Sequence, residues 1–162
     1  MVDQQSTDIK YMQLALELAR QAGAQGEVPV GALLVDHKQN KIVAKGLNLR
    51  EKMQSPLAHA ELLALHRGSQ KIGSWRLMDC TLYVTLEPCP MCAGALINSR
   101  IHRVVFGALD PKAGATHTLL QLGTDTRFNH RFEVTGGVLQ DECAQLLREF
   151  FQKLRKKKSE KP

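Results

Sequence analysis

The pattern of apolar and polar residues along the chain predicts alternating helices and strands. Near the start, apolar residues recur at spacings of three and four positions, namely Ile9, Met12, Leu16 and Ala19. Positions with this spacing share one face of a helix, so an amphipathic helix of about four turns is predicted. We expect Ser6 or Thr7 to be its N-cap and Gly23 to lie near its end.

Runs rich in β-branched and aromatic residues predict about five strands. These runs are residues 28–35, 42–47, 81–86, 103–106 and 132–135. The first two are joined by a polar run at 36–41, a pattern that favours a β-hairpin. The helices predicted between and after the strands are residues 58–66, ending by Gly68, residues 90–99 after Pro88, a short piece at 118–122, and residues 139–154.

The last predicted helix carries a wide apolar stripe. Its members are Leu139, Cys143, Leu146, Phe150 and Leu154, widened by Leu147 and Phe151. We expect the stripe to be buried against the domain's own sheet, and a dimer surface is the alternative. The order of elements predicts one three-layer α/β/α domain, residues 1–154, in which helices flank a central sheet of about five strands.

The positive charge is concentrated at the end of the chain. Among the 162 residues, 22 are Lys or Arg and 16 are Asp or Glu, and the formal net charge is +6. Most of this excess lies in a basic C-terminal tail, residues 155–162. A solvated, frayed helix end is one interpretation of the tail, and contact with RNA phosphates is the other.

The apolar runs are short. The longest mostly apolar stretch, residues 28–35, has eight residues, whereas a helix that crosses a bilayer needs about 20. The N-terminal residues include two acids and no Lys or Arg before Lys10, unlike a secretory signal. We therefore expect a cytoplasmic protein without membrane contact.

The four cysteines are of two kinds, and without an export signal we expect no disulfide framework. Cys80 and Cys143 lie in apolar surroundings and are expected to be small core residues. Cys89 and Cys92 form a C-x-x-C pair at the start of a predicted helix, where this spacing puts both sulfurs on one face. The positive end of a helix favours thiolates. Such a pair can serve redox exchange or bind a metal.

The segment His59-Ala60-Glu61 favours the metal. In mid-helix, residues two apart point about 200° apart, but at the opening of a helix both side chains can reach past its end. One imidazole and two thiolates supply three zinc ligands and leave a position for water, as in catalytic zinc sites. Glu61 is then placed to take a proton from that water, although an isolated glutamate would be a surface residue. The alternative is a closed structural site, completed by His66, His102, Cys80 or Cys143.

The two segments together, HAE at 59–61 and PCPMC at 88–92, resemble the signature of the zinc-dependent cytidine deaminase superfamily. The resemblance extends over about residues 8–154. Within the superfamily, the sequence resembles one branch in detail, the bacterial tRNA-specific adenosine deaminases. Beyond the signature it rests on EVPVGALLV (27–35), GLN (46–48), TLYVTLEPCPMCAGALINSRI (81–101), RVVFGALDPKAGA (103–115) and FNHRFEV (128–134). The long match from 81 to 115 identifies the branch.

This resemblance implies a cofactor and a mechanism. His59, Cys89 and Cys92 would bind one zinc ion per subunit, and Glu61 would move protons between water, the adenine N1 and the leaving ammonia. The residues implied in substrate binding are Val28, Pro29, Asn48, Ala60, Asp110, Lys112, Asn129, His130 and Arg131. Among them, the first two would pack against a flipped base.

The polar members of this set have structural alternatives. Asn48 would contact the sugar and base, but it can also cap a strand end. Asp110 and Lys112 would contact nucleotides beside the target, although Asp110 with Pro111 can also start a turn. Residues 129–131 would lie near the anticodon-loop surface, or they can form a solvated loop.

Two departures from the family pattern concern RNA contacts. Leu109 stands where the family often has an arginine, and residues 117–128 follow no family pattern.

The resemblance implies a homodimeric enzyme that converts the wobble adenosine of an arginine tRNA to inosine. A deaminase of a free base or nucleoside, of guanine or cytosine type, is one alternative, and a non-catalytic zinc module that binds RNA is another. A small-substrate enzyme commonly closes its pocket with a segment over the ligand, whereas this chain ends in a basic helix that suits a phosphate backbone. The presence of Glu61 argues against the non-catalytic module.

Overall fold

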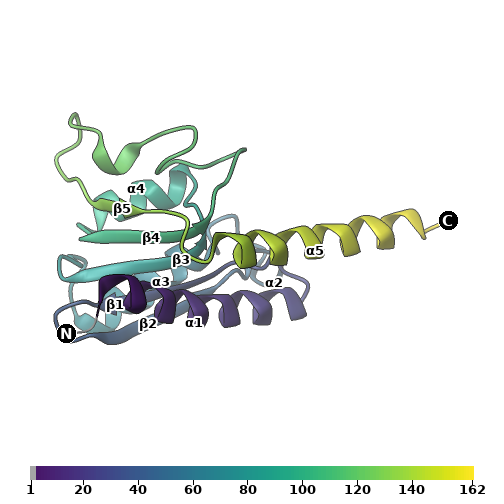
Figure 1. Cartoon of the computed structure of the whole chain (residues 1–162), viewed down its shortest axis with the longest axis horizontal. Helices are drawn as coiled ribbons and strands as arrows, with labels where there is room; N and C mark the ends of the chain where they lie inside the picture. The colour runs from purple at the N-terminus through teal and green to yellow at the C-terminus, as the bar shows by residue number, and fades with distance from the viewer. Residues whose placement is uncertain (1–2) are drawn as a thin grey trace.

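A five-stranded mixed sheet forms the centre of the structure, a computed structural model that describes residues 3–162 (Figure 1). The strands lie in the order β2-β1-β3-β4-β5, and their bounds are β1 Gly31–Asp36, β2 Lys41–Leu47, β3 Cys80–Leu86, β4 Arg103–Ala108 and β5 Glu133–Thr135. β1 runs antiparallel to β2 and β3, whereas β3, β4 and β5 are parallel. The predicted sheet of about five strands is confirmed.

Helices cover both faces of this sheet. Their bounds are α1 Gln4–Ala24, α2 Arg50–Met53, α3 Ala60–Ile72, α4 Pro90–Asn98 and α5 Gln140–Ser159, with a 3-10 turn η1 at Leu122–Thr124. α1 and the first turns of α5 pack on one face, and α3 and α4 pack on the other. The three-layer α/β/α prediction is therefore confirmed. Within residues 3–162, no helix has the length and apolar character that crossing a membrane requires.

Successive residues of β1 point into two separate cores. Ala32 and Leu34 pack with residues of α3 and α4, whereas Leu33 and Val35 pack with residues of α1 and α5. All four side chains are 2% exposed or less. Because both faces of the strand are covered, its sequence is a continuous apolar run and not an alternating one.

The predicted cap of the first helix is wrong. α1 begins at Gln4 with Asp3 as its N-cap residue, so Ser6 and Thr7 lie inside the helix. The Thr7 hydroxyl donates a hydrogen bond to the Asp3 carbonyl one turn earlier. A hydroxyl that bonds within the helix does not cap it.

The predicted end of the second long helix is also wrong. α3 passes through Gly68 and ends at Ile72, and its C-cap residue Gly73 has the left-handed conformation that favours glycine. Gly68 is small because the helix lies close against the sheet, and a methyl group there would overlap the side chain of Leu34. Glycine at position 68 therefore allows close packing of the helix on the sheet and does not end the helix.

Smaller differences concern the strand ends and the connections. β1 begins three residues later than predicted, β4 extends two residues further, and the short piece expected at 118–122 is η1 at Leu122–Thr124. The four-residue helix α2 was not predicted. Such short elements carry too few residues for a periodic pattern.

The stripe of the last helix is buried only over its first turns. Cys143 is 1% exposed, whereas Phe151 and Leu154 are 40% and 38% exposed. Figure 1 shows α5 extending past the edge of the sheet towards the C-terminus. A helix of 20 residues is about 30 Å long, whereas strands of six or seven residues span about 20 Å, so the helix outruns the sheet. α5 also continues across the predicted boundary at 154/155 and ends at Ser159, with residues 151–162 exposed.

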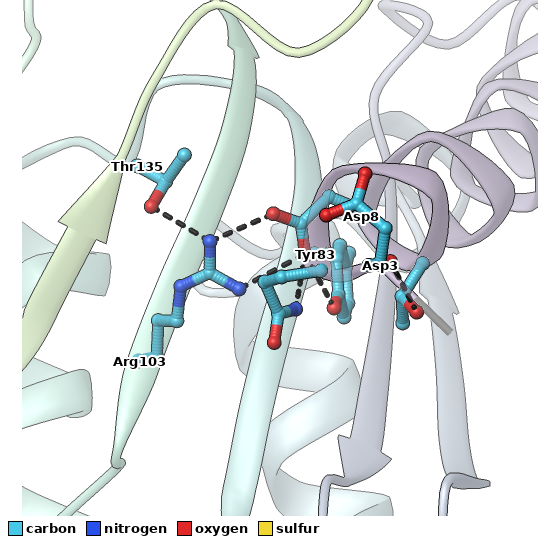
Figure 2. Close-up of polar contacts among 7 residues, drawn as sticks. Asp3, Asp8, Tyr83, Arg103 and Thr135 are labelled. Atoms are coloured by element: carbon cyan, nitrogen blue, oxygen red, sulfur yellow. Dashed lines mark hydrogen bonds and ion pairs between the residues drawn. The ribbon is translucent and has the colours of Figure 1, made fainter. Parts of the chain in front are cut away.

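A buried ion pair joins α1 to the parallel part of the sheet (Figure 2). The guanidinium of Arg103 donates to both carboxylate oxygens of Asp8, at 2.9 and 2.7 Å, and to the hydroxyl of Thr135 at 2.8 Å. The Tyr83 hydroxyl donates to the same carboxylate at 2.9 Å. The side chains of the pair are only 12% and 5% exposed, so each charge depends on the other.

Asp8→Asn should lower the free energy of unfolding by about 3 kcal/mol, because it leaves Arg103 buried without a charged partner. Urea denaturation measures this loss. The matched control is Asp79→Asn, which removes an exposed ion pair with Lys38 and should change stability little. A loss no larger than that of the control would show that the buried pair does not hold α1 to the sheet.

Candidate active site

The chain topology brings two helix N-termini to one edge of the sheet. β1 lies between β2 and β3 and is antiparallel to both, so its first residues pair with the last residues of each neighbour. α3 follows β2 through the short helix α2, and α4 follows β3 directly. At Gly46 of β2, a Cβ would overlap the backbone of α3, so this glycine allows α3 to lie directly on the strand.

Three candidate ligands lie where the two helices begin. His59 is the N-cap of α3 and Cys89 is the N-cap of α4, and both have extended backbone. Cys92 lies in the first turn of α4, which begins with Pro90. The His59 Nδ1 atom is 3.5 Å from Cys92 Sγ and 3.7 Å from Cys89 Sγ.

These distances fit a tetrahedral metal ion. Bonds of about 2.3 Å to sulfur and about 2.0 Å to nitrogen place the ligand atoms about 3.5 Å apart. Among residues 3–162, the three are the one group of His, Cys, Asp or Glu whose ligand atoms are close enough to hold an ion. The possible fourth ligands weighed from the sequence, His66, His102, Cys80 and Cys143, are not part of this group. Cys80 and Cys143 are instead free, buried thiols, as predicted.

The electrostatics of the cluster favour a thiolate. The pKa of Cys89 is lowered to about 4, because hydrogen bonding with the Cys92 thiol outweighs the effect of burial, and the His59 ring adds to the lowering. Thiolates are the form of cysteine that binds metals.

Glu61 lies beside the cluster as the second residue of α3. Its side chain is 4% exposed, and burial raises the pKa of its carboxyl, partly offset by Cys92 and His59. His59 has extended backbone whereas Glu61 is helical, so the two side chains border the same cavity in spite of their spacing. The expectation that both reach past a helix opening is confirmed.

A cavity of about 460 Å³ opens in front of this cluster. It is lined by residues from several elements: Val28, Val30, Asn48, Arg50, His59, Ala60, Glu61, Leu86, Glu87, Cys89, Leu109, Asp110, Pro111, Lys112, Ala113, Leu147 and Phe151. Its volume is in the range of cavities that hold small molecules or single groups of larger ones, about 300–1,000 Å³.

Asn48 borders the cavity and also fixes the backbone around it. Its amide donates to the carbonyl of Val28 at 3.1 Å, and its side-chain oxygen accepts from the amide of Arg50 at 3.1 Å. The buried carboxylate of Glu27 accepts from the amides of Glu51 and Lys52 in the first turn of α2. The sequence analysis did not identify Glu27, since nothing in the sequence pairs it with a helix 24 residues later.

Asp110 and Lys112 belong to a turn at the mouth of the cavity. The Asp110 carboxylate accepts from the backbone amides of Lys112 and Ala113, at 3.0 and 3.2 Å. The turn predicted as the structural alternative is therefore present, and the same residues border the cavity.

Two groups from the predicted site lie outside the cavity. Pro29 packs near Gly23 of α1. The segment Asn129–Arg131 precedes β5, and the His130 ring contacts the Ile101 carbonyl at 2.7 Å, while Arg131 bonds to carbonyls of its own loop. Because β5 begins opposite the start of β4, this segment lies at the sheet edge away from His59.

The remaining residues of the cavity were not predicted from the sequence as site residues. Leu147 of α5 packs against both cores, as expected, and also borders the cavity, whereas Phe151 borders the cavity and is exposed. Glu87 precedes the C-x-x-C segment and is 2% exposed. Burial works to raise the pKa of its carboxyl, but the hydrogen bonds it accepts, led by those from Thr118, hold that pKa below its usual value.

Comparison with known proteins places the chain in a family. Residues 6–155 match the model of the MafB19-like deaminase family. The tRNA-specific adenosine deaminase of Bacillus subtilis (strain 168) is 52% identical over 151 residues, covering 93% of this chain and 92% of the relative. The enzyme of the same name from Haemophilus influenzae is 53% identical over 151 residues, covering 93% of this chain and 87% of the relative. The chain belongs to the tRNA-specific adenosine deaminase family.

Solved structures agree with this membership. A structure from a study of A-to-I editing by tRNA:A34 deaminases at the wobble position of transfer RNA superimposes with a TM-score of 0.81 at 38% identity, covering 85% of this chain and 99% of the other. A guanine deaminase from Nitrosomonas europaea has a TM-score of 0.78 at 26% identity, covering 93% of this chain and 85% of the other. The fold is thus shared with a free-base deaminase, but the higher identities favour the tRNA branch.

Cys89→Ala should remove most of the metal bound by the purified protein, because it deletes one of three ligands. Metal analysis of protein purified without chelators measures the ion content per chain. Cys80→Ala is the matched control, since it also deletes a buried thiol but lies outside the cluster and should keep the metal. Equal metal content in the two variants would contradict the ligand assignment.

Proposed function

We propose that this chain hydrolyses the wobble adenosine in the anticodon loop of an arginine tRNA to inosine, as a cytoplasmic homodimer with one zinc ion per subunit. The observation that carries the proposal is the buried carboxyl of Glu61 next to the His59, Cys89 and Cys92 cluster, at one cavity. The relatives are named tRNA-specific adenosine deaminases, which supports an adenosine of tRNA as the substrate. The similar structure comes from a study of editing at the wobble position, which supports that position.

The chemistry needs one water and a group that moves protons. Deamination replaces the C6–N bond of adenine by a C6–O bond and releases ammonia. When bound by His59, Cys89 and Cys92, zinc would supply a water that is activated at neutral pH. The carboxyl of Glu61 would take a proton from the water, deliver a proton to N1 of the base, and protonate the leaving nitrogen.

The cavity suits a base that has left its stack. Val28 and Val30 provide apolar contact on one side, and Asn48 provides polar groups near the end of β2. The backbone hydrogen bonds of Asn48 hold its amide in one orientation, so it can contact a sugar or base without first being ordered. Flipping costs least in a single-stranded loop, where the base is already unpaired.

Cationic and aromatic side chains at the cavity support an RNA substrate. Arg50 and Lys112 border it and can contact phosphates, and Phe151 is a 40% exposed ring on which a neighbouring base can stack. α5 extends past the sheet and continues into the exposed basic tail, residues 155–162. This arrangement favours the RNA interpretation of the tail over a lid for a small substrate.

Exposed apolar side chains near the site can contact a second copy of the chain. Met53 at the end of α2 and Leu57 before α3 are 52% and 60% exposed, close in sequence to His59. Large exposed apolar side chains of this kind support association. The exposure of these two side chains supports the homodimer in the proposal.

A comparison of substrates tests the function. The purified protein should form inosine from a stem-loop with the sequence of an arginine tRNA anticodon arm, while free adenosine and a perfectly paired duplex of the same sequence should react poorly. Mass analysis of nucleosides after digestion measures inosine, and the same assay follows free cytidine and guanosine. Turnover of a free nucleoside together with an inert stem-loop would overturn the proposal in favour of the free-base alternative.

Glu61→Gln should lower turnover of the stem-loop by about 10² to 10⁴-fold, because the amide keeps the shape of the side chain but cannot shuttle protons. Metal content and RNA affinity should stay close to those of the parent protein. The matched control is Glu133→Gln, an exposed position at the start of β5. If activity stays within a few-fold of the parent, Glu61 is not the proton carrier.

A further inference from the structure

A single buried carboxylate gathers the loop that follows β4. The Glu87 side chain accepts hydrogen bonds from the amides of Asp110, Thr116, His117 and Thr118, at 3.2, 3.3, 2.9 and 2.9 Å, and from the Thr118 hydroxyl. It is 2% exposed. The donors come from positions eight residues apart in the sequence, so this carboxylate holds both ends of the loop 110–118.

The backbone next to Glu87 strengthens the attachment. Its own amide donates to the Ala108 carbonyl at 2.9 Å, and the Pro88 carbonyl accepts from Ala115 at 2.9 Å. Gly114 lies directly over the carboxylate, where a Cβ would overlap the Glu87 carboxyl group. The loop is therefore folded around this one side chain.

Hydrogen-bond capacity separates Glu87 from the catalytic groups. A carboxylate offers about four lone-pair sites, and Glu87 already accepts from four amides and one hydroxyl. No acceptor capacity remains for a substrate or a proton, although the side chain borders the cavity. Its effect on the reaction must pass through the loop.

The loop that Glu87 holds forms part of the cavity. Asp110, Pro111 and Lys112 border it, and Glu87 is two residues before Cys89. One short segment thus carries a candidate metal ligand and fixes the loop that faces the substrate. We propose that Glu87 is a positioning residue that sets the affinity for the RNA substrate by fixing the Asp110–Lys112 turn relative to the metal cluster. This inference rests on the proposed function.

Glu87→Gln removes one acceptor without changing the size of the side chain. If the amide oxygen keeps the three bonds to Thr116, His117 and Thr118, the new NH₂ group faces the amide of Asp110, and two donors then oppose each other. The KM for the anticodon stem-loop should rise about tenfold. A buried donor left unsatisfied has a free-energy cost of that order, and here the cost falls on the turn that contacts the RNA. Turnover at saturating RNA and metal content should change little.

Amide hydrogen exchange gives a readout that needs no activity. In the RNA-free protein with its metal, exchange at Asp110 should accelerate in Glu87→Gln, and exchange in the core strand β3 should not. Gly114→Ala is the second variant, because it leaves Glu87 intact and displaces its carboxylate by overlap. It should raise KM and speed loop exchange in the same way. Glu133→Gln, away from the loop, is the control and should match the parent.

The outcomes distinguish this inference from the proposed function. If the parent deaminates the stem-loop but both variants keep its KM, the positioning role is wrong, even where loop exchange becomes faster. A fall in the folded fraction with KM unchanged for the remaining enzyme would likewise show a structural role only. If the parent itself does not deaminate RNA, the proposed function fails, and unchanged loop exchange in both variants would separately refute the control of the loop by Glu87.

Discussion

The meeting of two helix N-termini at one sheet edge is the constraint on which the site depends. α3 and α4 follow β2 and β3, and antiparallel β1 brings the ends of these two strands together. The N-cap positions then place His59 and Cys89 with extended backbone, so their side chains reach beyond the helices. The electropositive ends of both helices favour anionic sulfur at the point where an ion would bind. Displacing either helix by even 1 Å would disturb the ligand distances.

Buried carboxyl groups serve two different purposes in this molecule. Asp8, Glu27 and Glu87 accept hydrogen bonds from a guanidinium or from backbone amides, and each joins segments that are distant in the sequence. These hydrogen bonds hold separate segments of the structure together. Glu61 instead borders the cavity beside the ligand cluster, and burial raises the pKa of its carboxyl. Both Glu61 and Glu87 border the cavity, but donors occupy the oxygens of Glu87, whereas Glu61 lies beside the candidate metal ligands, where a buried carboxyl can carry protons.

Local features were predictable because they depend on neighbours in the sequence. The ligand cluster follows from His59, Cys89 and Cys92 being at predicted helix openings, and the buried runs of β1 and β3 follow from their apolar residues. Predictions failed where the role of a residue depends on a contact with a residue distant in the sequence. Gly68 was predicted to end the helix, but it lies within α3, where Leu34 leaves no room for a larger side chain. The pairing of β5 with β4 likewise places segment 129–131 away from the cavity, and its contact with the anticodon loop stays a prediction.

The sequence by itself determined the α/β class, the family and the residues that can bind a metal and carry protons, because short-range patterns and a specific motif encode these. Only the tertiary structure decided which residues complete the cavity. The loop around Glu87 and the α2 cap from Glu27 depend on contacts more than 20 residues apart. The exposure of Phe151 depends on α5 outrunning the sheet. Long-range contacts of this kind leave no periodic signal, because any acid can accept from any amide that the fold brings near it.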